Sequence, residues 1–420
     1  MPHRFALPLL ALLAALWVPA VPLAATPVIA EDGAAEPTAL RLRSFRSHHY
    51  LIHTNLTREE TVPFGRHMDA VFEQYQRRFS GFIARELDPM PLYLLRTRED
   101  YVRFMAEHDI DASHSGGLFF VTHSLQGLAT WAESGSRPRT FRVLQHEGFH
   151  QFAWNYIGPN LPVWLNEGLA QYFEDAVIVD GRMTAGLTHR GRIERVRSAL
   201  EAGQALTLNR LNGVSGRVWN LSLREQPEHA ALLYAQSWSV VYFLIHGDEG
   251  AHQERFVQYL KLLNQGNGAD EAMLLAFGRE GFVAVQEGWR DFARNQQPGD
   301  LATATERLEF LGNGLRLLDE QGGAMPASID ELRETLQAYG FRTRRQEMGV
   351  SRRLEASDDA LFAFERDSGT GRPYAASFRM LAPSRDDLPP RIVAPGLSPE
   401  PTLVWYRDAD GTLVQDIAYR

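Results

Sequence analysis

The stretch His146-Glu147-Gly148-Phe149-His150 is followed, fourteen positions after its second histidine, by Trp164-Leu165-Asn166-Glu167-Gly168-Leu169-Ala170. On an α-helix, residues four apart lie one turn apart on the same face, so His146 and His150 can direct two imidazole nitrogens at one ion. Zn²⁺ accepts nitrogen and carboxylate ligands at about 2.0–2.1 Å. Glu167 is the natural third ligand, which leaves the fourth coordination position to water. The two segments therefore predict a Zn²⁺ site.

Glu147 projects beside the face that carries the two histidines. In helical His-Glu-x-x-His segments, a glutamate in this position acts as a general base. A helix is expected from Arg139 to about Tyr156, because Ser136 and Pro138 are helix start signals. A second helix is expected to begin near Asn166, with its acidic residue in the first turn. The alternative is that both histidines are surface or packing residues, and the helical context favours the metal site.

The pattern His146-Glu147-x-x-His150 with Trp164-Leu165-Asn166-Glu167-Gly168-x-Ala170-x-Tyr172-x-Glu174 resembles the gluzincin metallopeptidases. The second segment is close to the alanyl-aminopeptidase branch. The short spacing after Leu161-Pro162-Val163 is more similar to an uncharacterised bacterial family of exported peptidase-MA-like proteins. The resemblance covers residues 45–300, and its specific part is 146–175. It implies zinc ligands at His146, His150 and Glu167, and peptide-bond hydrolysis by a zinc-bound water with Glu147 as the catalytic base.

One element of the aminopeptidase branch is missing. Alanyl-type aminopeptidases carry a Gly-x-Met-Glu-Asn strand that captures the free amine of the substrate, and no such segment precedes His146. The run Gly323-Ala324-Met325 lies far downstream and continues into Pro326. We therefore expect a zinc endopeptidase rather than an aminopeptidase. If a free amine were recognised after all, Glu133 would be the first carboxylate to mutate.

Residues 117–121 and 127–131 predict a β-hairpin with a turn at 124–126. The gluzincin resemblance implies a strand edge just before the metal helix that binds the substrate peptide as an extra strand. Residues 127–131 are the candidate for this edge, and an ordinary interior hairpin is the alternative.

The resemblance also implies a tyrosine or histidine in the helical half that hydrogen-bonds the tetrahedral oxyanion. Tyr234 is the first candidate, followed by Tyr242 and His229. A core tyrosine on an apolar helix is an equal alternative for Tyr234. Further histidines that could line a cleft, without the spacing of ligands, are His114, His123 and His189.

The N-terminus has the order of a secretory signal peptide. His3 and Arg4 precede an apolar run over 5–18, and small residues follow at 20, 24 and 25. The run is shorter than the roughly 18–20 residues that span a bilayer, which favours cleavage over an anchor. We expect a signal peptide at 1–25, a mature chain that starts between Val21 and Glu31, and a secreted or periplasmic protein.

Composition narrows the choice of partners. The chain has no cysteine, so it has no disulfide and no lipid attachment point. Its net charge of −9 would become −10 when the signal peptide removes Arg4 and no acid, which argues against nucleic acid or anionic membrane as a partner. The most apolar later run, 231–245, contains Gln236 and two serines and reads as a buried helix rather than a membrane span. A peptide or protein substrate is the expected partner, and the sequence leaves the oligomeric state open.

The fold class expected is α+β, with a mixed β-sheet part, a helical part that carries the His-Glu-x-x-His motif, and a small C-terminal α+β domain. The predicted divisions are a disordered linker at 26–44, a metallopeptidase domain at 45–300 (mixed α/β over 45–135 and helical over 136–300), and a domain of unknown role at 305–420. The expected strands are 50–54, 91–95, 360–365, 373–380, 402–407 and 412–419. Besides the two helices at the motif, one helix is expected to end at Phe79, with Pro63 in its first turn. Further helices are expected at 98–107, 190–202, 228–246, 250–266, 269–277, 281–295, 306–321 and 328–339. The last of these is opened by a capping box at Ser328–Glu331.

A competing interpretation is a catalytically degenerate zinc- or peptide-binding protein of the cell envelope. Metal binding needs only the three ligands, so the intact Glu147 favours an enzyme.

Overall fold

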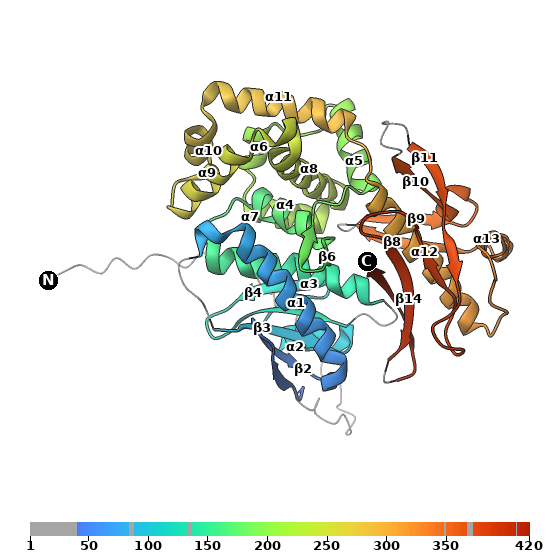
Figure 1. Ribbon diagram of the computed structural model, residues 1–420. Coiled ribbons are helices and arrows are strands. Elements are labelled where there is room, and N and C mark those ends of the chain that lie inside the picture. The colour runs from blue at the N-terminus through green and yellow to red at the C-terminus, as the bar shows by residue number, and fades with distance from the viewer. Residues whose placement is uncertain (1–39, 84–87, 133–135, 348–349, 368–372, 409) are drawn as a thin grey trace, which may run out of the picture.

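A computed structural model of the chain describes residues 40–83, 88–132, 136–347, 350–367, 373–408 and 410–420. The predicted signal peptide, most of the predicted linker and Glu133 lie outside the described residues. The protein is α+β, as predicted: a mixed sheet and a helical layer are followed by a C-terminal part of helices and strands (Figure 1). Within the described residues, no helix has both the length and the apolarity to cross a membrane.

The first part is built on one five-stranded sheet. Its strands, in spatial order, are β1 (Arg43–Arg46), β2 (Tyr50–Thr54), β3 (Met90–Leu95), β5 (Gln126–Trp131) and β4 (Gly117–Val121). The three inner strands run parallel, and β1 and β4 are antiparallel to their neighbours. Residues Arg43 and Ser44 pair with β2, so the predicted disorder of residues 26–44 is wrong at this end of the linker.

The hairpin of β4 and β5 was predicted correctly, but its edge strand was not. β5 lies between β3 and β4, and β4 ends the described sheet. The chain forms β5 only after β4, and β5 returns on the inner side, where it also pairs with β3. The strand-adding edge expected at 127–131 is therefore wrong, and the available edge is Gly117–Val121.

Helices cover the two faces of this sheet. Apolar side chains of β2, β3 and β5 that point to one face join a core with α1 (Arg58–Arg78) and α3 (Arg137–Phe152), and those on the other face pack with α2 (Arg98–Ala106). Helix α1 begins with a reciprocal capping box between Thr57 and Glu60. This cap starts the helix at Arg58, which puts Pro63 in the second turn rather than in the first.

The helical part follows α3, whose last turn widens into a π-helical turn at Ala153–Ile157. It contains α4 (Val163–Glu174), α5 (Arg190–Glu201), α6 (Leu208–Asn212), α7 (Gly216–Glu225), α8 (Pro227–His246), α9 (Gln253–Asn264), α10 (Ala269–Phe277) and α11 (Arg279–Asn295), and the small hairpin of β6 (Val177–Val179) and β7 (Arg182–Thr184). Helix α9 starts later than predicted because Gly250, the predicted first residue, has a positive φ of 85° and follows two left-handed residues, Asp248 and Glu249. The elements α6, α7, β6 and β7 were not predicted.

The C-terminal module, residues 305–420, shares its first helix with the preceding part. Helix α12 runs over Asp300–Glu320, and it starts six residues before the expected position, where Leu301 and Ala302 pack near the β6–β7 hairpin. The other elements are α13 (Ile329–Ala338), the ribbons β8 (Arg342–Glu347) with β9 (Val350–Glu355) and β10 (Ala363–Asp367) with β11 (Pro373–Ser377), and a sheet in the order β12 (Arg379–Leu381), β13 (Arg391–Val393), β14 (Pro401–Arg407) and β15 (Leu413–Tyr419).

The cap of α13 differs from the predicted one. Ser328 accepts a hydrogen bond from the Glu331 backbone N–H, as expected. The Glu331 carboxylate accepts from the Ala327 N–H instead of closing the box on Ser328.

Candidate metal centre

The three predicted ligands come together between α3 and α4. His146 Nε2 lies 3.3 Å and His150 Nε2 lies 3.5 Å from Glu167 Oε2. Each of the three residues offers one possible ligand atom, and these three atoms lie within 4.8 Å of one another. Their side chains are only 12%, 11% and 16% exposed, so the group lies in a recess and not on the open surface.

The geometry of this group fits a tetrahedral zinc site. With bonds of about 2.0–2.1 Å, neighbouring ligand atoms of a tetrahedral site lie roughly 3.3–3.4 Å apart. The two nitrogen–oxygen distances are close to this value. Two buried polar atoms of the group, His150 Nδ1 and Glu167 Oε2, have no hydrogen-bond partner among the described residues. A cation would give Glu167 Oε2 the partner that buried polar atoms normally have.

The charges of the three ligands depend on one another. Burial would raise the pKa of Glu167, but the nearby histidines, His150 first, outweigh burial and lower this pKa to about 2. Burial would lower the pKa of His146, and the nearby carboxylates of Glu167 and Glu174 instead raise it well above the ordinary value. Burial also opposes protonation of His150, yet the Glu167 charge raises the pKa of His150. In the metal-free chain, protons therefore balance a carboxylate charge that a cation could balance instead.

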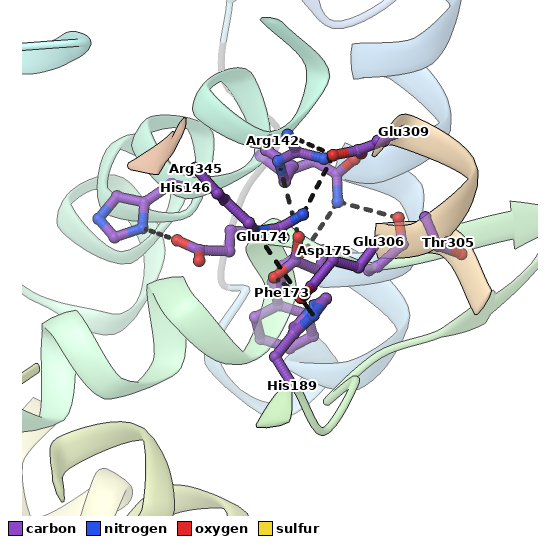
Figure 2. Close-up of polar contacts among 12 residues, drawn as sticks. Arg142, His146, Phe173, Glu174, Asp175, His189, Thr305, Glu306, Glu309 and Arg345 are labelled. Carbon is purple, nitrogen blue, oxygen red and sulfur yellow. Dashed lines mark hydrogen bonds and ion pairs between the residues drawn. The ribbon is translucent and has the colours of Figure 1, made fainter. Parts of the chain in front are cut away.

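A fourth residue, Glu174, orients one ligand. Glu174 Oε2 lies 2.7 Å from His146 Nδ1, at the C-terminal end of α4 (Figure 2). Such a carboxylate fixes which imidazole nitrogen faces the metal and increases the basicity of the ligand. Glu174 belongs to the motif, but no role was predicted for it. Its position seven residues after Glu167, two helical turns along the same face, was the signal that could have assigned one.

Glu147 faces the sheet edge. Its Oε2 accepts a hydrogen bond of 2.9 Å from the Phe119 backbone N–H on β4. Gly117 allows this approach, because a Cβ at that position would lie 2.4 Å from Val143 on α3. The carboxylate that was predicted to be the base is therefore held beside the edge strand.

A large cleft opens over these residues. Its volume is about 2750 Å³, compared with roughly 300–1,000 Å³ for sites that hold small molecules. Its walls include the edge strand β4, the helices α3, α4 and α7, and the ribbon β8–β9 of the C-terminal module. His146, Glu147, His150 and Glu167 all line it.

The remaining candidates divide by position. Tyr234 lines the cleft on α8, and burial first and the Glu167 charge second raise its pKa well above the ordinary value. His114 and His123 also line the cleft, on its sheet side. Three residues do not line it: His229, Tyr242, which packs against Tyr172 and Trp238, and His189, which lies 3.1 Å from Asp175.

A family model described as "Protein of unknown function (DUF1570)" matches residues 141–266. This segment runs from the middle of α3 into the end of α9, and it contains His146, Glu147, His150, Glu167 and Tyr234. A search of curated proteins found no match to the chain.

Proposed function

We propose that this chain is an exported zinc-dependent metallopeptidase that cleaves peptide bonds within chains. The observation that carries the proposal is that His146, His150 and Glu167 converge in one cleft, beside the carboxylate of Glu147, which is not one of the three predicted ligands. The size of the cleft supports a peptide or protein substrate. The predicted signal peptide supports a secreted or periplasmic location.

In this proposal His146, His150 and Glu167 hold the zinc, and Glu174 keeps His146 turned toward it. Zinc bound there would lower the pKa of a water molecule to about 7 and polarise a carbonyl group. Glu147 would take a proton from the attacking water and return it to the leaving amine. The raised pKa of Tyr234 keeps its hydroxyl protonated, so Tyr234 would donate a hydrogen bond to the oxyanion.

Glu147→Gln separates the metal from the chemistry. Because Glu147 is not a ligand, this variant should keep zinc and lose hydrolysis of an unfolded protein substrate. His146→Ala, His150→Ala and Glu167→Ala should lose zinc and hydrolysis together. Metal analysis of the purified full chain and a protein-cleavage assay measure both properties.

Two results would contradict these assignments. Loss of zinc from a folded Glu147→Gln variant would show that Glu147 is a ligand. Zinc in the unmodified chain without cleavage of any unfolded protein or peptide would favour the degenerate zinc- or peptide-binding protein.

Acetylation of a substrate's N-terminus tests the endopeptidase assignment. No amine-capturing strand precedes His146, and β4 offers a sheet edge that can bind peptide on both sides of the scissile bond. Acetylation of a good peptide substrate should therefore change kcat/KM by less than about tenfold. A loss of about a thousandfold would show that the free amine is recognised, since sites built around a polar partner discriminate strongly.

A further inference from the structure

A network of charged side chains lies next to the metal centre and continues into the C-terminal module. We call it the ion network. It contains four carboxylates and four arginines, all partly or fully buried: Glu174, Asp175, Glu306, Glu309, Arg142, Arg192, Arg345 and Arg352. Each of these carboxylates lies within ion-pair distance of at least one of the arginines, and His189 also contacts Asp175 and Glu306.

The network begins at the residue that orients His146. Arg192 on α5 forms ion pairs with Glu174 and with Asp175, the latter at 3.2 Å. Arg142 Nε on α3 lies 3.8 Å from the other oxygen of Asp175. The Asp175 side chain is only 7% exposed, so it is a buried junction between two helices and the carboxylate behind His146.

The C-terminal module supplies the other half of the network. Arg142 forms an ion pair with Glu309 on α12, and Arg345 on β8 binds the second oxygen of Glu309 at 3.1 Å (Figure 2). Glu306 is bound by Arg352 at 3.0 Å. Burial would raise the pKa of Glu309, and the charges of Arg142 and Arg345 outweigh burial and lower it.

The residue of α3 that binds the C-terminal module, Arg142, is close to the metal centre along the helix. Arg142 precedes His146 by four residues, so the two side chains lie one turn apart on the same face of α3. The module thus reaches His146 along two routes: through the backbone of α3, and through Asp175, Arg192 and Glu174.

We propose that the C-terminal module is a positioning element of the metal centre, in which Glu309 holds Arg142 and, through Asp175 and Arg192, the Glu174 carboxylate that orients His146. The proposal rests on the metal site of the proposed function. Removing one charge leaves its partner buried and uncompensated, so the remaining side chains must rearrange. Loss of the partners that orient a ligating histidine typically lowers metal affinity about 10–100-fold.

The same interface offers a matched control. Arg137, at the start of α3, pairs with Asp416 on β15 at 3.2 Å, and its guanidinium lies over the Tyr406 ring. This pair also joins α3 to the C-terminal module and is also partly buried. Within the described part of the chain, this pair forms no hydrogen bond or ion pair with Glu174, Asp175 or Arg192, so it holds the interface without leading to His146.

The test compares the zinc affinity of Glu309→Gln with that of Asp416→Asn, both in the full chain, by competition with a chromogenic chelator. Glu309→Gln should bind zinc about tenfold more weakly than the unmodified chain, and Asp416→Asn should stay within about twofold. The thermal midpoints of the zinc-free proteins show whether the two variants loosen the interface to a similar degree.

If Glu309→Gln does not fold, Arg142→Lys takes its place, because lysine keeps the charge but cannot bridge two carboxylates as a guanidinium does. Unchanged zinc affinity in Glu309→Gln, or in Arg142→Lys where it replaces that variant, overturns the proposal. An equal loss in Asp416→Asn also overturns it, because it would indicate a general effect of the interface.

The two proposals can fail separately. A chain that binds zinc and hydrolyses nothing contradicts the peptidase, while its zinc affinity still tests the ion network. Hydrolysis with equal zinc affinity in all variants contradicts only the positioning role. Absence of zinc binding in the unmodified chain would overturn both.

Discussion

Tyr234 lies outside the zinc-binding motif, but its position in the cleft suits a role in the chemistry. It lines the cleft, and only 9% of its surface is exposed. Tyr242 lies two turns further along α8, outside the cleft, and packs among aromatic rings. The two tyrosines therefore form a matched pair on one helix.

Tyr234→Phe should lower kcat about 10²–10³-fold with little change in KM, because removal of one oxyanion donor has an effect of this size in other acyl-transfer enzymes. Bound zinc should stay unchanged. Tyr242→Phe, measured in the same steady-state assay, should retain full activity. Equal activities of the two variants would remove Tyr234 from the proposed site.

Among individual residues, the sequence pattern predicted most of the candidate metal centre. Helical periodicity is local, so it was enough to place His146 and His150 on one face, while Glu167 was predicted from the motif segment on the second helix. Glu174 was within reach of the same argument. Arg192 was not, since its contact with Glu174 depends on how α4 and α5 both pack against α8, which no local pattern specifies.

Among the elements, the contact of α4 with α8 determines where Glu167 lies. Gly168 follows the ligand directly, and a Cβ at this position would lie 2.6 Å from the Ser237 carbonyl oxygen and 2.8 Å from Val241. The two helices are therefore as close as a glycine permits.

Gly168→Ala should destabilise the protein by about 1–3 kcal/mol, because overpacking outweighs the roughly 0.5–1 kcal/mol that alanine gains over glycine in a helix. It should also weaken zinc binding, since α4 must shift and Glu167 shifts with it. Gly281→Ala on α11 is the control, because its added Cβ meets the flexible end of Arg255 at 2.9 Å and otherwise makes an ordinary contact of 3.9 Å with Phe277. Urea unfolding measures both variants, and a neutral Gly168→Ala would contradict the close approach.

Elements with strong local signals were predicted, and those that depend on distant partners were not. Start signals indicated α3, and the long apolar run at 231–245 indicated α8. Helix α6 has only five residues, and β8 reads Arg-Thr-Arg-Arg-Gln-Glu, with no apolar alternation to mark a strand. The prediction that residues 127–131 form the sheet edge was wrong, because the pairing of β5 with β3 is non-local.

For the whole molecule, the ion network gives a pH dependence. The pKa of Glu309 is lower in the folded chain than in the unfolded chain, because Arg142 and Arg345 outweigh the effect of burial. A depressed pKa means that the unfolded state binds more protons, so the stability due to this carboxylate is present above its unfolded pKa and is lost as the pH falls through the folded pKa. The unfolded pKa of a glutamate is about 4.3.

Glu309→Gln should therefore cost about 3–5 kcal/mol near neutral pH, the usual effect of breaking a buried pair, and this difference should shrink below about pH 4.3. Urea unfolding of the zinc-free chain between pH 7 and pH 3.5 measures it. Glu355→Gln removes a more exposed carboxylate, which pairs with Arg353, and should cost less than about 1 kcal/mol at every pH. A difference for Glu309→Gln that is independent of pH would contradict the depressed pKa.

The α+β class was predictable at this scale from the succession of strand and helix patterns, and it is confirmed. The continuity of α12 across the expected boundary was not predictable, because Pro298-Gly299 marks an interruption of the chain without saying which side the next helix packs on. The ion network joins residues from 142 to 352, and only the folded chain brings them together.

The hydrogen bond from the Phe119 N–H to Glu147 joins the edge strand to the carboxylate proposed as the base. An N–H on the outer side of an edge strand is the donor that an added strand would use. In the proposed peptidase, Glu147 is therefore a placeholder for the substrate backbone: a peptide that pairs with β4 at Phe119 takes over the donor and releases the carboxylate oxygen. Binding of the substrate would therefore change the hydrogen bonding of the base itself, because the oxygen that accepts the Phe119 N–H in the free chain loses this donor to the peptide.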